Sequence, residues 1–79
     1  MAIFNPYIVF ILKIGENYVT GVTSDIDRVV HEYSRKKKGF SLVFQKHFDD
    51  QSKAREYESL INKWDVNKKE ALINGDVHD

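Results

Sequence analysis

The sequence predicts an α+β fold: a three-stranded antiparallel sheet carrying about three helices, in the order β-β-α-β-α-α. Two observations predict this class. Strand-like runs rich in β-branched and aromatic residues cover 7–14, 17–22 and 40–48. Segments in which apolar residues recur at helical spacing follow the second and third of these runs. Since 79 residues suit one domain, we expect a single domain over 1–79 with its core at about 7–75.

The first two strands are predicted to form a hairpin. Residues 7–14 are apolar on both alternations, so both faces of this strand should be covered. Gly15, Glu16 and Asn17 supply the residues of a tight turn, after which the chain returns along 17–22.

The first helix is expected to begin after Ser24 and to end near Ser34. Ser24 and Asp27 have the spacing of a capping box, with Ser24 as the N-cap. An apolar stripe follows at i, i+3, i+4 and i+7, made by Ile26, Val29, Val30 and Tyr33.

The second half of the chain predicts a strand and two helices. In 40–48, Phe40, Leu42 and Phe44 alternate with less apolar residues, which predicts one more apolar face. Residues 49–52 are expected to cap a second helix that buries Ala54, Tyr57, Leu60, Ile61 and Trp64. We therefore expect Tyr57 and Trp64 to be core residues rather than platforms on which bases stack. A third helix, about 66–73, should stop at Asn74-Gly75.

Composition and charge exclude several classes of function. The chain has no cysteine, which rules out disulfides and thiolate metal sites, and its three histidines show no metal-ligand spacing. Twelve basic and twelve acidic side chains cancel, so nucleic acid would have to be attracted by a local patch. The candidate patch is Arg35, Lys36, Lys37 and Lys38, for which a solvated loop is the plainer interpretation.

We expect a cytoplasmic protein without a membrane partner. The apolar run from Tyr7 to Leu12 is too short to span a bilayer. No basic segment precedes it and no small-residue cleavage site follows it, so a signal peptide is not expected.

Three segments together resemble a known family. YIVFILK, TGVTSDIDRVVHEY and DDQSKAREYESLINKWDVNKKEALING occur in the order and spacing of the GIY-YIG endonuclease superfamily. They look most like its small stand-alone bacterial members, and the resemblance covers about residues 7–75. It implies hydrolysis of DNA phosphodiesters. In that chemistry a glutamate holds a divalent metal, two tyrosines help to activate water, and a helix arginine contacts the phosphate.

Carried over residue by residue, the resemblance places a degenerate active site in this chain. Glu58 matches the metal-binding glutamate and Gly21 matches the glycine of the second motif. Phe10 and Val19 then occupy the two tyrosine positions, and Val29 occupies the arginine position. A lone carboxylate should hold Mg²⁺ weakly, because Mg²⁺ gives up its water reluctantly.

A second register uses Tyr18 and Arg28 in place of Val19 and Val29. These two residues are ten apart, which is the spacing of the family's tyrosine and arginine. A bulge near Thr20-Gly21 would turn Tyr18 inward. We favour the register anchored on Gly21, because the apolar stripe of the first helix needs Val29.

Three functions follow as alternatives. The first is a GIY-YIG-like domain with impaired catalysis that binds nucleic acid or regulates. The second is an active Mg²⁺-dependent DNA endonuclease that uses Tyr18, Arg28 and Glu58. The third is a protein-interaction module without a nucleic-acid role. For the first, we expect the groove to be an exposed face of the sheet, flanked by Glu58 and the basic run 35–38.

Overall fold

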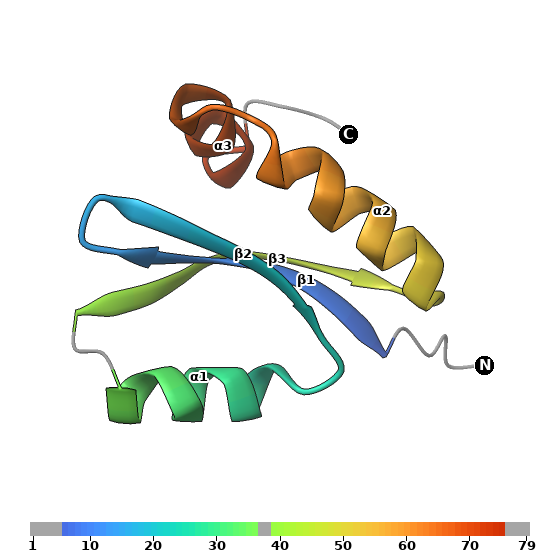
Figure 1. Cartoon of the computed structure of the whole chain (residues 1–79), viewed down its shortest axis with the longest axis horizontal. Coiled ribbons are helices and arrows are strands. Elements are labelled where there is room, and N and C mark those ends of the chain that lie inside the picture. The colour runs from blue at the N-terminus through green and yellow to red at the C-terminus, as the bar shows by residue number, and fades with distance from the viewer. Residues whose placement is uncertain (1–5, 37–38, 76–79) are drawn as a thin grey trace.

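The computed structural model describes residues 6–36 and 39–75. Its elements are β1 (Tyr7–Ile14), β2 (Asn17–Thr23), α1 (Ile26–Lys36), β3 (Phe40–Phe48), α2 (Gln51–Asn62) and α3 (Val66–Ile73). The strands form one antiparallel sheet in the order β2-β1-β3. Figure 1 shows α1 on one face of this sheet and α2 and α3 on the other. The predicted α+β class, element order and hairpin are confirmed.

β1 is the centre of the core. Its residues from Ile8 to Leu12 are all buried, because neighbouring strands flank it and helices cover both faces. On the face toward α2 and α3, Val9 and Ile11 cluster with the buried Ala54, Ile61 and Leu72. The expectation that one face of the sheet is exposed as a groove was therefore wrong.

β3 changes its inward face at a bulge. Leu42 lies opposite Leu12 whereas Phe44 lies opposite Ile11, so Val43 is the extra residue. Because neighbouring residues of a regular strand point to opposite faces, Leu42 and Phe44 also end on opposite faces. The prediction of one more apolar face along 40–48 was wrong for this reason.

Aspartates cap all three helices. The Asp25 carboxylate accepts a hydrogen bond from the Arg28 backbone N–H at 3.1 Å, so Asp25 caps α1 and the predicted Ser24 cap was wrong. Asp50 and Asp65 accept in the same way from the N–H groups of Ser52 and Lys68. α1 also continues past Ser34 to Lys36.

The apolar stripe by which α2 packs on the core is narrower than predicted. Ala54 and Ile61 are buried, and Tyr57 and Trp64 pack against the core cluster, which confirms the core role predicted for these aromatics. Trp64 lies beyond the end of α2 at Asn62, so its predicted place on this helix was wrong. Leu60 is 52% exposed and lies outside the stripe, so its predicted burial was wrong. Within the described residues, no helix is long and apolar enough to cross a membrane.

Candidate functional site

A hollow of about 330 Å³ opens where β2 ends and α2 begins. This end of the sheet is on the right of Figure 1. The walls of the hollow are formed by the start of β1, by the end of β2 with the residue that follows it, and by one face of α2. Its lining residues are Tyr7, Val22, Thr23, Ser24, Gln51, Arg55 and Glu58. The hollow contains Glu58, which the sequence predicted as a site residue. It also contains several polar residues that the sequence did not predict as site residues.

The wall formed by α2 is a polar stripe beside its buried stripe. Gln51, Arg55 and Glu58 are spaced i, i+4 and i+7, which places them on one side of the helix. Ala54, immediately before Arg55, is fully buried and holds this side of α2 close to the sheet. Among the described residues, the side chains of all three make neither a hydrogen bond nor an ion pair. They are available to a ligand.

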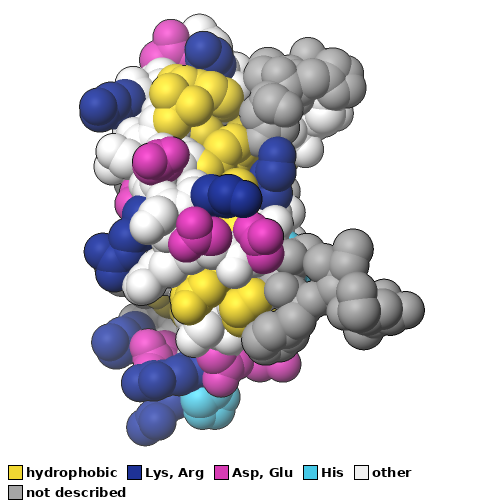
Figure 2. Space-filling view, turned by 90° about the vertical axis from the view of Figure 1, so that its right-hand side faces the viewer, with side chains coloured by type: hydrophobic (Ala, Val, Ile, Leu, Met, Phe, Trp, Pro, Cys, Tyr) yellow, Lys and Arg dark blue, Asp and Glu magenta, His cyan; other side chains and the backbone are white. Residues whose placement is uncertain are grey.

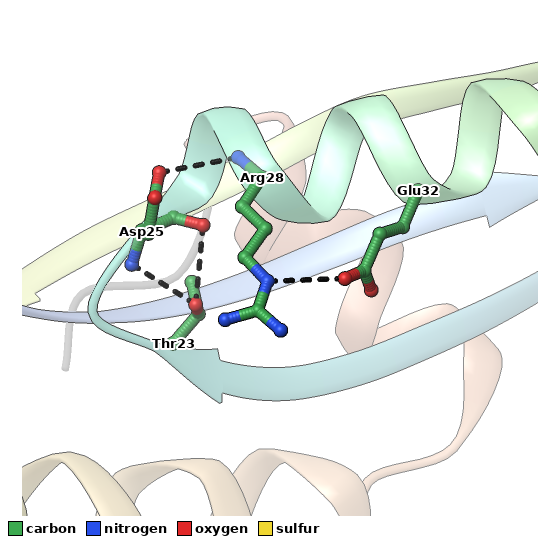
Figure 3. Close-up of polar contacts among 4 residues, drawn as sticks. All are labelled: Thr23, Asp25, Arg28 and Glu32. Atoms are coloured by element: carbon green, nitrogen blue, oxygen red, sulfur yellow. Dashed lines mark hydrogen bonds and ion pairs between the residues drawn. The ribbon is translucent and has the colours of Figure 1, made fainter.

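The wall formed by β2 ends in an ordered turn. The Thr23 hydroxyl accepts a hydrogen bond from the Asp25 N–H at 3.0 Å and donates to the Asp25 carbonyl at 3.2 Å. Together with the Asp25 cap on α1, these bonds fix the path from β2 into the helix (Figure 3). The Ser24 side chain, between the two bonded residues, lines the hollow.

Arg28 is held by its own helix. Its Nε donates to Glu32 Oε1 at 3.1 Å, an exposed i, i+4 pair that Figure 3 shows along α1. Arg28 does not line the hollow that contains Glu58.

Tyr18 points away from Arg28 and Glu58, toward α3. β2 pairs with β1 without interruption from Asn17 to Thr23, so the bulge that would turn Tyr18 is absent. The Tyr18 hydroxyl lies 3.3 Å from Glu70 Oε1, and Tyr18 packs against the core cluster on the α2 and α3 side. Along β2, Tyr18 is about 17 Å from Thr23 at the hollow. The structure therefore does not bring Tyr18, Arg28 and Glu58 together.

The motif positions Phe10 and Val19 share the other face of the sheet. Phe10 pairs with Gly21, and Val19 is two residues from Gly21 on the same strand, so both side chains point toward α1. The ring tip of Phe10, Cζ, would be 2.7 Å from a Cβ placed on Gly21. Glycine at position 21 is thus required for the Phe10 ring to lie across β2. A tyrosine at position 10 would place its hydroxyl over the same strand. Val29 is half-buried on α1.

The basic end of α1 is remote from the hollow. Arg35 and Lys36 are exposed in the last turn of the helix, whereas Lys37 and Lys38 lie outside the described residues. α1 begins soon after the end of β2, and its eleven residues extend over about 16 Å. Figure 1 shows the helix running back from the end of the sheet at which β2 stops. The two regions are therefore separate cationic surfaces.

Figure 2, which views the molecule from the side of the hollow, shows basic and acidic side chains intermixed. This agrees with a net charge of zero. Attraction of an anion on this face depends on individual side chains and not on a broad basic field.

The hollow offers a metal ion a single carboxylate, which would suit only a weakly bound ion that keeps most of its water. Glu58 is the one Asp or Glu that lines it. Across residues 6–36 and 39–75, no three His, Asp or Glu side chains gather closely enough to enclose a metal ion. Mg²⁺ is often bound through one or two carboxylates while water and substrate phosphate fill its other positions. Glu58 would hold such an ion, which would supply Lewis-acid activation of a phosphate or of water.

The fold is that of a small α+β domain, with one three-stranded antiparallel sheet and helices on both of its faces. The solution NMR structure of the UPF0213 protein BH0048 from Bacillus halodurans is similar to this chain. The TM-score is 0.62 and the sequence identity 25%, over 86% of this chain and 82% of that one. No protein-family model matches the chain, and no curated protein matches it.

Sequence reasoning missed Arg55 and the polar residues around it. The i, i+4, i+7 spacing of Gln51, Arg55 and Glu58 was a visible signal on the predicted helix. No sequence signal joined that stripe to Thr23 and Ser24, which lie about thirty residues earlier in the chain.

Proposed function

We propose that this chain is a GIY-YIG-like domain that binds nucleic acid and has lost efficient phosphodiester hydrolysis. The observation that carries the proposal is the side-chain chemistry at the matched positions. Phe10 and Val19 on the α1 face of the sheet have no hydroxyl, and the half-buried Val29 on α1 has no charge. Glu58 remains as the matched polar group.

The loss of activity follows from what these positions do in the resemblance. Without a phenol, no tyrosine assists the attacking water, and without a guanidinium, α1 does not neutralise the phosphate. Removing one well-placed donor that stabilises developing charge commonly lowers a rate by about 10²–10³. Several such losses together leave a binding domain rather than an enzyme.

The remaining cationic side chains support binding. Arg55 lines the hollow, and Arg35 and Lys36 are exposed at the end of α1; these side chains would contact backbone phosphates. Because the net charge is zero, we expect modest affinity that falls with salt in proportion to a few phosphate contacts.

The test combines a binding and a cleavage assay. Fluorescence anisotropy with labelled single-stranded and branched DNA, at several salt concentrations, should give an affinity that declines linearly on a log–log plot. In Mg²⁺ or Mn²⁺, the protein should cut the same DNA no faster than its Glu58→Gln variant. A wild type that binds neither DNA would contradict the proposal and favour a protein-interaction module. Cleavage that Glu58→Gln abolishes would identify an active endonuclease.

The positions themselves are tested by restoration. Phe10→Tyr, Val19→Tyr and Val29→Arg made together should produce metal-dependent cutting that Glu58→Gln then removes. A matched control carries Tyr18→Phe in the same background and should cut equally well, because Tyr18 lies on the opposite face of the sheet. Loss of cutting in that control would return Tyr18 to the site.

A further inference from the structure

We propose that Arg55 is the phosphate-binding residue of the hollow, with Ser24 and Gln51 as its accompanying hydrogen-bond donors. The ligand is a backbone phosphate of nucleic acid. This inference rests on the proposed function and adds a binding residue to it that the resemblance does not supply.

Arg55 differs from the other cations of the described chain in that it lines this hollow, and its side chain is uncommitted. Arg28 is paired with Glu32, and Lys53 with Asp49 at 3.5 Å. Arg55 has no hydrogen-bond or ion-pair partner within the part of the chain that the structure describes, although it lines a concave surface. A planar guanidinium offers paired donors that match two phosphate oxygens, so such a group at a hollow suits a phosphate.

The neighbours of Arg55 on one side are suited to the same ligand. Gln51, one turn earlier on α2, carries an amide N–H₂, and Ser24, on the opposite wall, carries a hydroxyl. Both groups donate hydrogen bonds and both lack a protein partner among the described residues. The Thr23 hydroxyl is already engaged with Asp25, which leaves Ser24 as the open donor of that turn.

Glu58 determines where in the hollow the phosphate binds. It is three residues after Arg55, about 4.5 Å further along the helix axis, and its carboxylate repels an anion. The phosphate therefore binds on the Gln51 side of Arg55. The Glu58 end is left for water or a cation.

Arg55 in this position replaces the binding lost at Val29 without replacing its catalytic role. Val29 is on α1, whereas Arg55 approaches from α2, on the other face of the sheet. A phosphate held from α2 is retained although Phe10 and Val19, which face α1, carry no hydroxyl to assist an attacking water. The side chain of Arg55 thus explains how a domain without the catalytic groups keeps a phosphate contact.

The experiment compares Arg55→Gln with Lys63→Gln on labelled single-stranded DNA by anisotropy across a salt series. Both variants remove one positive charge from α2 or its C-cap, but Lys63 does not line the hollow. Arg55→Gln should weaken binding about tenfold and lower the log–log salt slope by about 0.7, the loss of one phosphate contact on a single strand. Lys63→Gln should change affinity by less than about twofold. Arg55→Lys should keep the slope but lose part of the affinity, because it retains the charge without the fork.

The outcomes separate this inference from the proposed function. Wild-type binding that Arg55→Gln leaves unchanged in affinity and slope would overturn the role of Arg55 and leave the proposed function standing. Equal weakening by Arg55→Gln and Lys63→Gln would also overturn it, because a general charge effect would then be enough. Failure of the wild type to bind overturns both. Circular dichroism melts should be the same for all variants, since Arg55 is exposed and without a partner in the described chain.

Discussion

Replacing Gly21 by alanine tests the contact that sets the geometry of the matched motif positions. The backbone itself permits alanine, because Gly21 is not among the described glycines with positive φ, which are Gly15, Gly39 and Gly75. The obstacle is the Phe10 ring, whose Cζ and Cε2 would be 2.7 Å and 3.1 Å from the new Cβ. Phe10 is only 6% exposed, so its ring has little room to move aside.

The expected loss of stability follows from these distances. Forcing one methyl group into a packed core costs typically about 1–3 kcal/mol. Replacing glycine by alanine at a compatible backbone returns about 0.4–1 kcal/mol by restricting the unfolded chain. We therefore expect Gly21→Ala to lower the free energy of unfolding by about 1–2 kcal/mol and the Tm by about 5–15 °C in a domain of this size.

A double-mutant cycle with Phe10→Leu isolates the clash. Leucine has no atoms at the ring tip, so in that background Gly21→Ala should be neutral or slightly stabilising. The four chains of the cycle are compared by urea unfolding followed by circular dichroism. An equal cost of Gly21→Ala with Phe10 and with leucine at position 10 would show that the ring is not the obstacle.

Three further predictions test single contacts. Asp25→Ala should lower the free energy of unfolding by about 1 kcal/mol in urea melts, because α1 loses its N-cap bond, and an unchanged midpoint would contradict that cap. Trp64→Ala should cost about 2–3 kcal/mol by the same measurement, less than a fully buried tryptophan, because Trp64 is only partly buried against the core cluster. That cost includes the cation–π contact with the Lys68 ammonium, 4.3 Å from the ring centroid, and wild-type stability would mean that the ring does not pack on the core. Tyr18→Phe should cost no more than about 1 kcal/mol and leave DNA binding unchanged, because its hydroxyl contacts only Glu70 at 3.3 Å among the described residues; weaker binding in anisotropy would contradict this assignment.

Local signals in the sequence determined the elements of this fold. Examples are the two-sided apolar run of β1, the turn at Gly15 and the end of the third helix at Asn74-Gly75. Each signal acts within a few residues, so it can be recognised without knowledge of the rest of the chain. The same short-range logic placed Val19 rather than Tyr18 on the face of Phe10, because side chains alternate along a strand.

Only the tertiary structure decided the details that depend on docking. The bulge at Val43 arises from the hydrogen-bonded pairing of β3 with β1, and no residue spacing within 40–48 predicts it. Leu60 fits the apolar period of α2 but is left exposed, because the angle at which α2 lies on the sheet selects which part of the stripe is covered. The meeting of Arg55 with Ser24 has the same cause. Residues from separate elements share a hollow only when packing brings those elements together. The local sequence does not determine how far apart two elements lie in space.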